Sequence, residues 1–251
     1  MPFMKKLILI ASTLVLASCS FIGLTYKVGN AISAESIVRV GQFTDISSCC
    51  SVDVIYTQEP EAQYVLLTCD SNLVDYYDIH VEGSTLVVDT KYGASISARA
   101  KTFVTVNSPK LSGVKISGSG DVQITNDLAT DSDFTVKLSG SGDLDAEGTV
   151  TCKNFSCSVS GSGDVDIFGV KTGSAGFKDS GSGSIEVERL TAETVSVKMT
   201  GSGGVNLVCD NVGDIDADLS GSGSLHLSGT ARSLRSNASG SGRVNSKNLV
   251  L

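Results

Sequence analysis

The sequence has no tryptophan, only three prolines and few aromatic side chains, which make up 6% of its 251 residues. A core without large aromatic residues suits stacked strands of valine, isoleucine and leucine better than a globule built around a deep pocket. No segment shows a clear amphipathic helical period. The scarcity of proline also argues against a random linker, although there are 27 glycines. The composition therefore favours a β-structure in which glycine has specific backbone roles.

Positive charge is also scarce, because 19 lysines and arginines stand against 27 acidic residues and give a net charge of −8. A surface of this sign repels phosphate backbones and no basic stripe is evident, so a nucleic-acid partner is not expected. Paired CxxC motifs, a P-loop, a dinucleotide fingerprint and a nucleophile elbow are all missing. His80 and His226 have no clustered partners, so we expect surface or packing roles for them.

The first nineteen residues resemble a bacterial lipoprotein signal. Two lysines at positions 5 and 6 precede an apolar run over residues 7–16, and a Leu-Ala-Ser-Cys lipobox ends at Cys19. Cys19 is the predicted lipidation site, Ser20 after it favours the outer membrane of a Gram-negative bacterium, and residues 20–35 form a linker. Apolar character continues to residue 24, so an uncleaved membrane anchor is the alternative. Either arrangement tethers the chain to the cell envelope, on its periplasmic or its surface face.

A Gly-Ser-Gly corner, with threonine or serine before it, recurs seven times in the second half of the chain. The intervals between the first glycines of successive corners are 22, 21, 20, 20, 20 and 19 residues. Such a period indicates stacked supersecondary units. The glycines of the corners are Gly118, Gly120, Gly140, Gly142, Gly161, Gly163, Gly181, Gly183, Gly201, Gly203, Gly221, Gly223, Gly240 and Gly242.

The residues that flank each corner keep the same register. An apolar residue follows two positions after each second glycine, as at Val122, Leu144 and Val165, and alternates with polar residues. A period of two is typical of a short strand with one buried face. The pattern over residues 111–251 therefore predicts an all-β fold: a single-stranded parallel β-helix (β-solenoid) with coils of ~20 residues. We expect the corner glycines to allow positive φ and close stacking; Asp179 interrupts an otherwise apolar column.

Residues 36–110 contain strand-like segments without the Gly-Ser-Gly corner. These segments are 38–46, 52–57, 64–68, 77–81, 85–89 and 103–106, with a hairpin turn at residues 82–84. They predict either irregular early coils or a β-rich cap that seals the N-terminal end. The final strand at residues 248–251 is too short to cap the other end well. Self-association through exposed strand edges is therefore an open alternative.

This order of elements resembles the family of the putative auto-transporter adhesin, head GIN domain. The resemblance rests on Gly41-Gln42-Phe43, the strand at 52–58, the Asp-Ser-Asn-Leu-Val motif at 70–74, the hairpin at 83–88 and the Ser-Gly-Ser-Gly-Asp corners. It covers nearly all of residues 36–251. It implies a parallel β-helix, export and a role in adhesion, with no catalytic residues to transfer. The chain departs from the family pattern at Cys49-Cys50 and in the last four corners, which lack the aspartate.

Six carboxylates occupy two equivalent positions on consecutive coils. We call them the acidic ladder: Asp121, Asp143, Asp145, Asp164, Asp166 and Glu186. Stacked carboxylates repel one another by roughly 1 kcal/mol or less per pair in water. A bound Ca²⁺ would relieve this repulsion, so a calcium or ligand site is one interpretation. The alternative is a row of solvated turn residues. No other metal or cofactor is expected.

Four lysines, Lys115, Lys137, Lys178 and Lys198, form an outward column before the corner. A lyase would need such a base beside its substrate, whereas charge balance with the acidic column explains them without catalysis. The six cysteines after Cys19 allow 15 pairings. One bridge among Cys49, Cys50 and Cys69 is open, and we expect Cys157 to pack as a small apolar residue.

Three functions remain. The principal hypothesis is a non-catalytic adhesin or ligand-binding envelope lipoprotein that holds a glycan or another envelope or host-surface component along the ladder. The second is a purely structural envelope protein. The third is a carbohydrate-active lyase or hydrolase that uses ladder carboxylates as acid and base.

Overall fold

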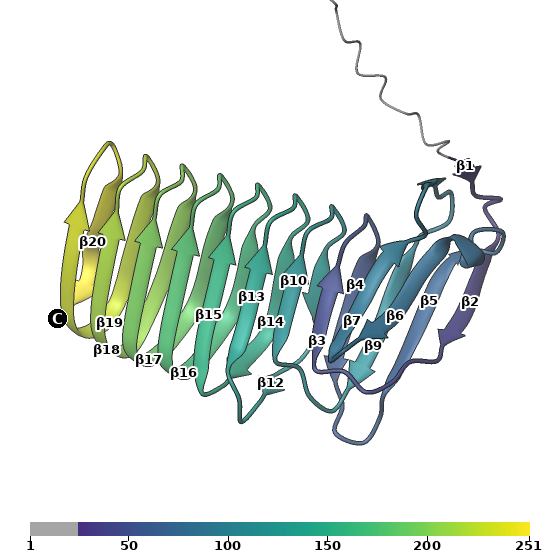
Figure 1. Cartoon of the computed structure of the whole chain (residues 1–251). Coiled ribbons are helices and arrows are strands. Elements are labelled where there is room, and N and C mark those ends of the chain that lie inside the picture. The colour runs from purple at the N-terminus through teal and green to yellow at the C-terminus, as the bar shows by residue number, and fades with distance from the viewer. Residues whose placement is uncertain (1–24) are drawn as a thin grey trace, which may run out of the picture.

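The computed structural model describes residues 25–251, so the predicted signal segment and Cys19 lie outside the described residues. The described chain forms one long stack of strands with a cap at its N-terminal end (Figure 1). The predicted parallel β-solenoid is confirmed, because every pairing between the coils is parallel and the three antiparallel pairings all lie in the cap. Over these residues, no helix is long and apolar enough to cross a membrane.

Each coil has two walls that meet at the Gly-Ser-Gly corner. The pre-corner wall contains β10 (Gly113–Ile116), β13 (Phe134–Leu138), β15 (Asn154–Val159) and the last parts of β16 (Val165–Asp179), β17 (Ser184–Met199), β18 (Gly204–Leu219) and β19 (Ser224–Ala238). The post-corner wall contains β11 (Val122–Ile124), β14 (Leu144–Thr151), the first parts of β16 to β19, and β20 (Arg243–Val250). A short third side begins at β12 (Leu128–Ala129), which pairs with the end of β14.

The core lies between the walls and is made of apolar columns in register. Val122 pairs with Leu144, Leu144 with Val165 and Val165 with Ile185, and all four are buried. Inside the pre-corner wall, Phe155 lies between Phe134 and Phe177, with ring centroids 6.2 and 5.7 Å apart. Because one coil cannot bury its own inner face, this stacking provides the core.

The corner glycines serve close approach between coils. A Cβ on Gly161 would lie 2.0 Å from the carbonyl oxygen of Gly140 in the preceding coil. The same carbonyl accepts a hydrogen bond from the backbone N–H of Ser162 at 3.1 Å. The expectation of positive φ is wrong at all corner glycines except Gly240, whose φ is 95°. The missing side chain lets the backbones stack, and at the other six corners the glycines have no positive φ.

One coil has no Gly-Ser-Gly motif and lies out of sequence order. It consists of β3 (Asp45–Ser48) and β4 (Asp53–Gln58), joined at Cys49–Val52. These strands pair in parallel with β10 and β11 on one side and with β7 (Thr85–Thr90) and β9 (Phe103–Ser108) on the other. Added Cβ atoms on Gly118 and Gly120 would meet the carbonyl oxygens of Cys50 and Val52, so this segment is an eighth corner.

Most of the cap lies between this coil and the repeats in the sequence, whereas in space the coil lies between the cap and the repeats. After β4 the chain forms β5 (Tyr64–Asp70), the 3-10 turn η1 (Val74–Tyr76), β6 (Tyr77–Glu82), β7 and β9, then returns to β10. β5 pairs antiparallel with β9 and with β2 (Ser33–Val38), and β6 pairs antiparallel with β7. β1 (Thr25–Val28) and β8 (Ala94–Ser97) form a separate two-stranded sheet. Residues 36–110 therefore supply both an early coil and a cap.

Asp70 joins three segments of the cap. Its buried carboxylate accepts hydrogen bonds from the backbone N–H groups of Ala31 (2.5 Å), Arg99 (2.8 Å) and Ala100 (3.0 Å). Burial alone would raise the pKa of Asp70, but these hydrogen bonds outweigh it and lower the pKa below 3.8. Asn72 adds to the joint, because its side chain accepts from Asn30 N–H at 3.0 Å. The Asp-Ser-Asn motif thus fastens the first described strands to the cap.

Substitution Asp70→Asn is expected to loosen the N-terminal segment at neutral pH. A group whose folded-state pKa is lowered stabilises the fold above its unfolded pKa, and this contribution disappears as the pH falls through the folded-state pKa. The variant should therefore differ from the wild type at pH 7 and converge with it in strong acid. Hydrogen exchange of residues 25–38 measures the loosening, with the exposed Asp75→Asn as control. Equal protection in both variants at pH 7 would contradict this role.

Candidate binding faces

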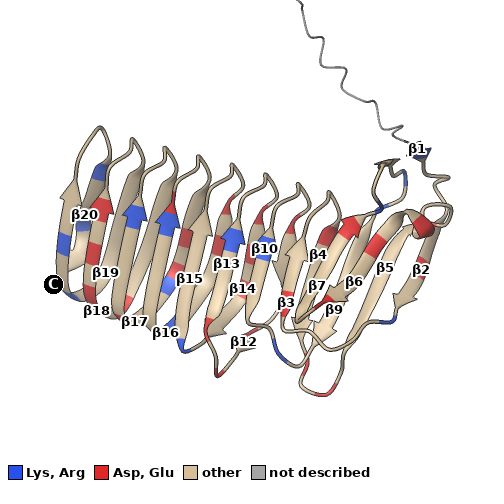
Figure 2. Cartoon of the chain, viewed as in Figure 1, with Lys and Arg blue, Asp and Glu red and all other residues tan. Residues whose placement is uncertain are grey.

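Charged side chains gather in bands on the two walls of the solenoid. Figure 2 shows basic residues at similar heights on neighbouring pre-corner strands and acidic residues at several of the corners above them. The acidic ladder occupies the corners and the post-corner wall, and the lysine column occupies the pre-corner wall. Since alternate residues face inward, both rows project outward from a rigid, hydrogen-bonded surface.

The corner aspartates of the ladder link consecutive coils. Asp121 Oδ1 accepts the backbone N–H of Asp143 at 2.9 Å, and Asp143 Oδ1 accepts that of Asp164 at 2.8 Å. Asp164 Oδ1 accepts both the N–H and the hydroxyl of Ser184 at 2.7 Å. Half of the ladder therefore has backbone partners, and one oxygen of each of these carboxylates is engaged within the solenoid. The row begins at Asp53, which accepts the N–H of Asp121 at 3.1 Å and which sequence reasoning missed.

The other three ladder carboxylates lie side by side on the outward face. Asp145 pairs in register with Asp166, and Asp166 with Glu186. Burial raises the pKa of Asp166 above 3.8, and the neighbouring carboxylates, led by Glu186, raise it further. These three carboxylates form a strip of negative charge. At one end of the strip, the side-chain amide of Asn206 donates a hydrogen bond from Nδ2 to Glu186 Oε1 at 3.0 Å.

The Glu186→Gln variant is expected to lower the pKa of Asp166, because it removes the carboxylate that contributes most of the repulsion. An NMR titration of the Asp166 side chain measures the shift directly. The remote Glu61→Gln variant is the control and should leave the titration unchanged. An unchanged pKa in Glu186→Gln would show that the two carboxylates do not interact in solution.

Two shallow grooves follow the post-corner wall. One, of about 460 Å³, includes Asp53, Asp121, Asp143 and Lys101, and the other, of about 380 Å³, includes Asp166 and Glu186. Within residues 25–251, no three histidine, cysteine or carboxylate side chains converge in the manner of a metal site. Calcium binding at the ladder therefore stays a prediction.

No lysine of the column forms an ion pair within the described part of the chain, although Lys198 is paired in register with Asp218. Lys115 pairs in register with Lys137 and Lys178 with Lys198, and Ser158 lies between the two pairs. Within residues 25–251, the only ion pairs within 4.0 Å are His80–Asp78 and Arg232–Asp214. The column lysines therefore make no direct ion pair with the acidic ladder, whose residues lie at the corners and on the post-corner wall. Charge balance across the coils stays a prediction.

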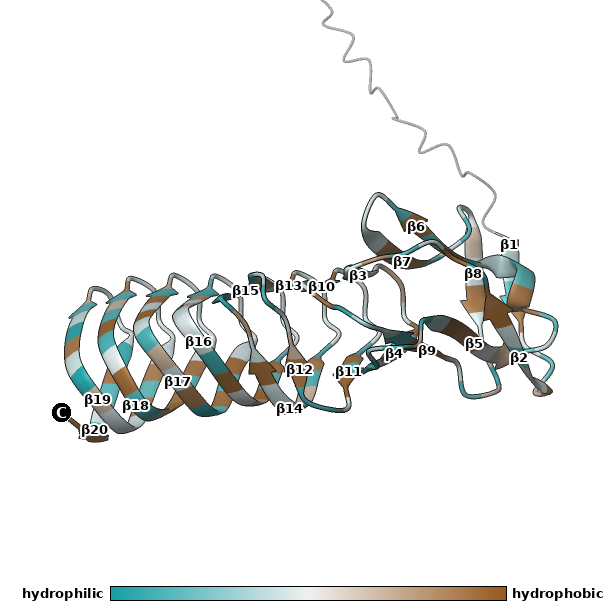
Figure 3. Cartoon of the chain, turned by 90° about the horizontal axis from the view of Figure 1, so that it is seen from below, coloured by the Kyte–Doolittle hydropathy of each residue, from teal (hydrophilic) through white to brown (hydrophobic). Residues whose placement is uncertain are grey.

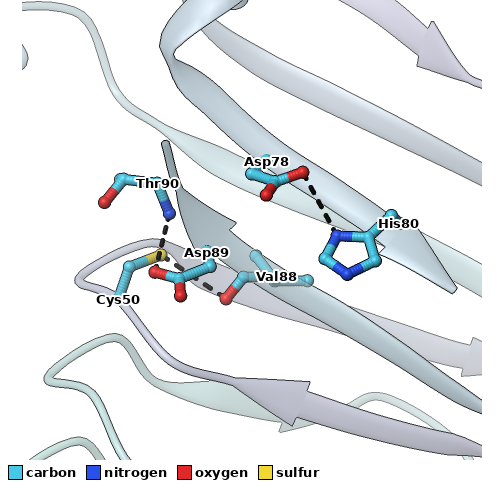
Figure 4. Close-up of polar contacts among 6 residues, drawn as sticks. All are labelled: Cys50, Asp78, His80, Val88, Asp89 and Thr90. Carbon is cyan, nitrogen blue, oxygen red and sulfur yellow. Dashed lines mark hydrogen bonds and ion pairs between the residues drawn. The ribbon is translucent and has the colours of Figure 1, made fainter. Parts of the chain in front are cut away.

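The histidines and cysteines do not assemble a reactive site in the described residues. His80 Nδ1 lies 3.2 Å from Asp78 Oδ1 on the exposed cap hairpin, and nearby Cys50 Sγ lies 3.7 Å from the carbonyl oxygen of Val88 (Figure 4). His226 lies on the post-corner wall, paired with Asn206 and Asn245. The six cysteines are free thiols, so the bridge considered for the cap is not formed. Burial is the main cause that raises the pKa of Cys50 to about 11, and Cys157 packs in the core.

The profile of the family described as putative auto-transporter adhesin, head GIN domain, matches residues 42–212 and again residues 198–251. Among curated proteins, no sequence gave a match.

Several solved structures share this fold. A putative adhesin from Bacteroides fragilis is 24% identical, with a TM-score of 0.80 over 89% of this chain and 100% of that chain. A putative lipid binding protein from Parabacteroides distasonis is 22% identical, with a TM-score of 0.73 over 90% of this chain and 100% of its own. A putative adhesin from Parabacteroides merdae is 21% identical, with a TM-score of 0.62 over 90% of this chain and 99% of its own. At these identities, the likeness shows the fold alone.

Proposed function

Because the chain belongs to the family described as putative auto-transporter adhesin, head GIN domain, we propose that it is an exported, lipid-anchored envelope protein that binds glycans without catalysing a reaction. The observation that supports this most directly is the pair of charged rows, held in register on walls whose backbones are fixed by neighbouring coils. Rigid, repeated, exposed groups suit an extended ligand with repeated chemistry, because binding then costs little ordering of the protein.

The arrangement of the ends agrees with a tether at the cap. β1 lies beside the cap, and the C-terminus lies at the opposite end of the solenoid (Figure 1). A lipid on Cys19 would hold the cap close to the membrane and leave both walls accessible. The outward residues of the walls are mostly charged or hydroxylated, as at Lys137, Ser158 and Asp166, and such groups favour a polar glycan over a lipid tail.

Catalysis has less support. Half of the ladder carboxylates are engaged with backbone N–H groups, and the two histidines lie on separate parts of the molecule. An acid–base pair for glycoside cleavage needs two carboxylates that face one bond with different protonation states. The outward ladder residues Asp145 and Asp166 instead lie side by side along the wall.

The test incubates the protein with neutral and charged polysaccharides, with and without calcium, and measures both retention and new chain ends. Retention without new ends is the expected result. New ends that disappear in Asp145→Asn and Asp166→Asn variants would replace this proposal with an enzyme. No retention on any polysaccharide would favour the purely structural alternative. Incorporation of labelled fatty acid, lost in Cys19→Ala, tests the anchor separately.

A further inference from the structure

The lysine column is a row of positive charge whose members form no ion pair within the described residues. All four lysines are exposed, and none lies within 4.0 Å of a carboxylate among residues 25–251. Neighbouring parallel strands lie about 4.8 Å apart, so Lys115 and Lys137, and likewise Lys178 and Lys198, place like charges on adjacent strands. Such a row repels itself. A bound polyanion would relieve the repulsion, as counterions do only in part.

We propose that the pre-corner wall binds a linear anionic polysaccharide along the solenoid axis, with Lys115, Lys137, Lys178 and Lys198 as its contacts. This inference rests on the proposed function and names the class of glycan and the wall that holds it. The row crosses four strand-to-strand steps from β10 to β17, a distance of roughly 19 Å. Uronic acid or sulfated sugar chains repeat their anionic groups every one or two sugars, which is comparable to one or two coils.

The surface between the lysines fits an extended sugar chain. The outward positions beside them hold small or hydroxylated residues: Thr135, Ser156, Gly176 and Ser196. Such residues leave the wall flat, and their hydroxyl groups can donate to and accept from sugar oxygens. The pre-corner strands that carry the column (residues 113–116, 134–138, 154–159, 174–179 and 194–199) have no exposed aromatic residue; the exposed Phe168 of β16 lies on the post-corner wall. This disfavours single-stranded nucleic acid, which binds through base stacking. A membrane surface is disfavoured because the stretch has no exposed apolar residue.

A groove of about 560 Å³ lies at the capped end of the column. It is lined by Lys115 and Lys137 on one side and by Glu82, Thr85 and Val87 of the β6–β7 hairpin on the other. Figure 3 shows this hairpin standing out to one side of the row of coils. Acidic residues bound the row, with Asp45 and Glu82 at the groove and Asp216 and Asp218 beyond Lys198. The favourable stretch therefore fits a short segment of a polyanion between two acidic limits.

The experiment measures binding of full-length protein in detergent to oligogalacturonate, dextran sulfate and neutral dextran. The test variant combines Lys115→Gln, Lys137→Gln, Lys178→Gln and Lys198→Gln. The matched control combines four other exposed lysines with the same charge change: Lys91→Gln, Lys110→Gln, Lys153→Gln and Lys171→Gln. We expect the wild type to prefer the anionic glycans. The test variant should lose at least tenfold in affinity and most of the salt dependence, whereas the control keeps both.

Several results would overturn the inference. One is an equal loss in the control variant, and another is equal binding of neutral dextran. Tighter binding of single-stranded DNA or of anionic phospholipid vesicles through the same four lysines would assign the wall to a different polyanion. The wild type and the test variant could also bind neutral glycans with equal affinity and anionic glycans with equal affinity. The proposed function would then stand, and only this inference would fail. New chain ends would instead contradict the proposed function.

Discussion

The Gly161→Ala variant is expected to lose about 3 kcal/mol or more of stability, the upper part of the range measured for overpacked sites. The added Cβ would lie 2.0 Å from Gly140 O and 2.7 Å from the carbonyl carbon of Ser139. Both contacts are with backbone, so two coils must separate locally for the methyl group to fit. That movement also weakens the hydrogen bond from Ser162 N–H to Gly140 O, which is worth about 1 kcal/mol.

Gly176→Ala is the matched control within the same coil. Its Cβ would lie 3.9 Å from the nearest atom, Phe155 O, and Gly176 has no positive φ. Its expected effect is within about 0.5 kcal/mol, as for most surface substitutions. Hydrogen exchange in the two adjoining coils should detect the difference, since solenoid coils can open locally. Similar losses in the two variants would mean that close approach at the corner is not the reason for glycine.

The repeated coils could be predicted from sequence because each coil has the same chemistry in the same order. Three features predict the same fold, a stack of coils: a period near 20 residues, an apolar residue after every corner, and alternation of apolar and polar residues on both sides of it. The direction in which each residue faces followed from alternation alone, so Cys157 could be placed in the core and Lys178 on the surface. The reason for glycine at the corners could not be predicted, because the sequence alone does not show whether glycine is needed for a positive φ or for close contact between coils.

The coil of β3 and β4 was hidden for two physical reasons. Its corner has Cys50 and Val52 in place of glycines, and its neighbour β10 lies 68 residues further along the chain. A periodic pattern shows only units that follow one another in the sequence. In the sequence, this coil is separated from the repeats by strands β5 to β9, although it pairs directly with β10 and β11. The pairing of Asp53 with Asp121 was lost with it. The only sequence signal was the aspartate one position after Val52.

The roles of the charged rows could not be predicted from the sequence either. Equal corner positions predict that aspartates lie one coil apart, but not whether each carboxylate faces its neighbour or the next backbone N–H group. The structure shows the second arrangement, in which Asp121, Asp143 and Asp164 each gain an attractive backbone N–H partner on the next coil. Likewise, the sequence placed four lysines on one outward column without showing that the acidic ladder lies on another wall.

Asp179 is the one charged residue in the buried core of the described chain, except for Asp70, whose carboxylate has three N–H partners. Its column neighbours are Val159 and Met199. Asp179 Oδ1 accepts the N–H of Gly181 at 2.9 Å, while Oδ2 is buried without a hydrogen-bond partner. Burial raises the pKa of Asp179 above 3.8, against the lowering effect of the Gly181 hydrogen bond and of the Gly203 N–H group, which lies near the carboxylate but does not form a hydrogen bond with Oδ2. No charged side chain contributes to this shift.

A raised folded-state pKa in a carboxyl group means that the folded protein holds the proton more tightly than the unfolded chain. Below the unfolded-state pKa, ionisation of Asp179 therefore does not lower the free energy of unfolding. As the pH rises from 3.8 to the folded-state pKa, the ionised carboxylate lowers it progressively. Above that pH the loss is constant. Leucine occupies the same column position at Leu138 and Leu219, so the site accepts an apolar side chain of similar size.

The Asp179→Leu variant should accordingly be more stable than the wild type at pH 7, by about 1–3 kcal/mol, the usual cost of an unsatisfied buried polar group. The gain should shrink as the pH approaches 3.8, where both folded and unfolded wild-type chains become protonated. Thermal unfolding of both proteins between pH 3.5 and 8 measures the difference, with the exposed Asp131→Asn as the control for general charge effects. A leucine variant that is less stable than the wild type at pH 7 would show that the carboxylate's bond to Gly181 outweighs its burial. A gain of constant size across this range would show that the penalty comes from packing and not from ionisation.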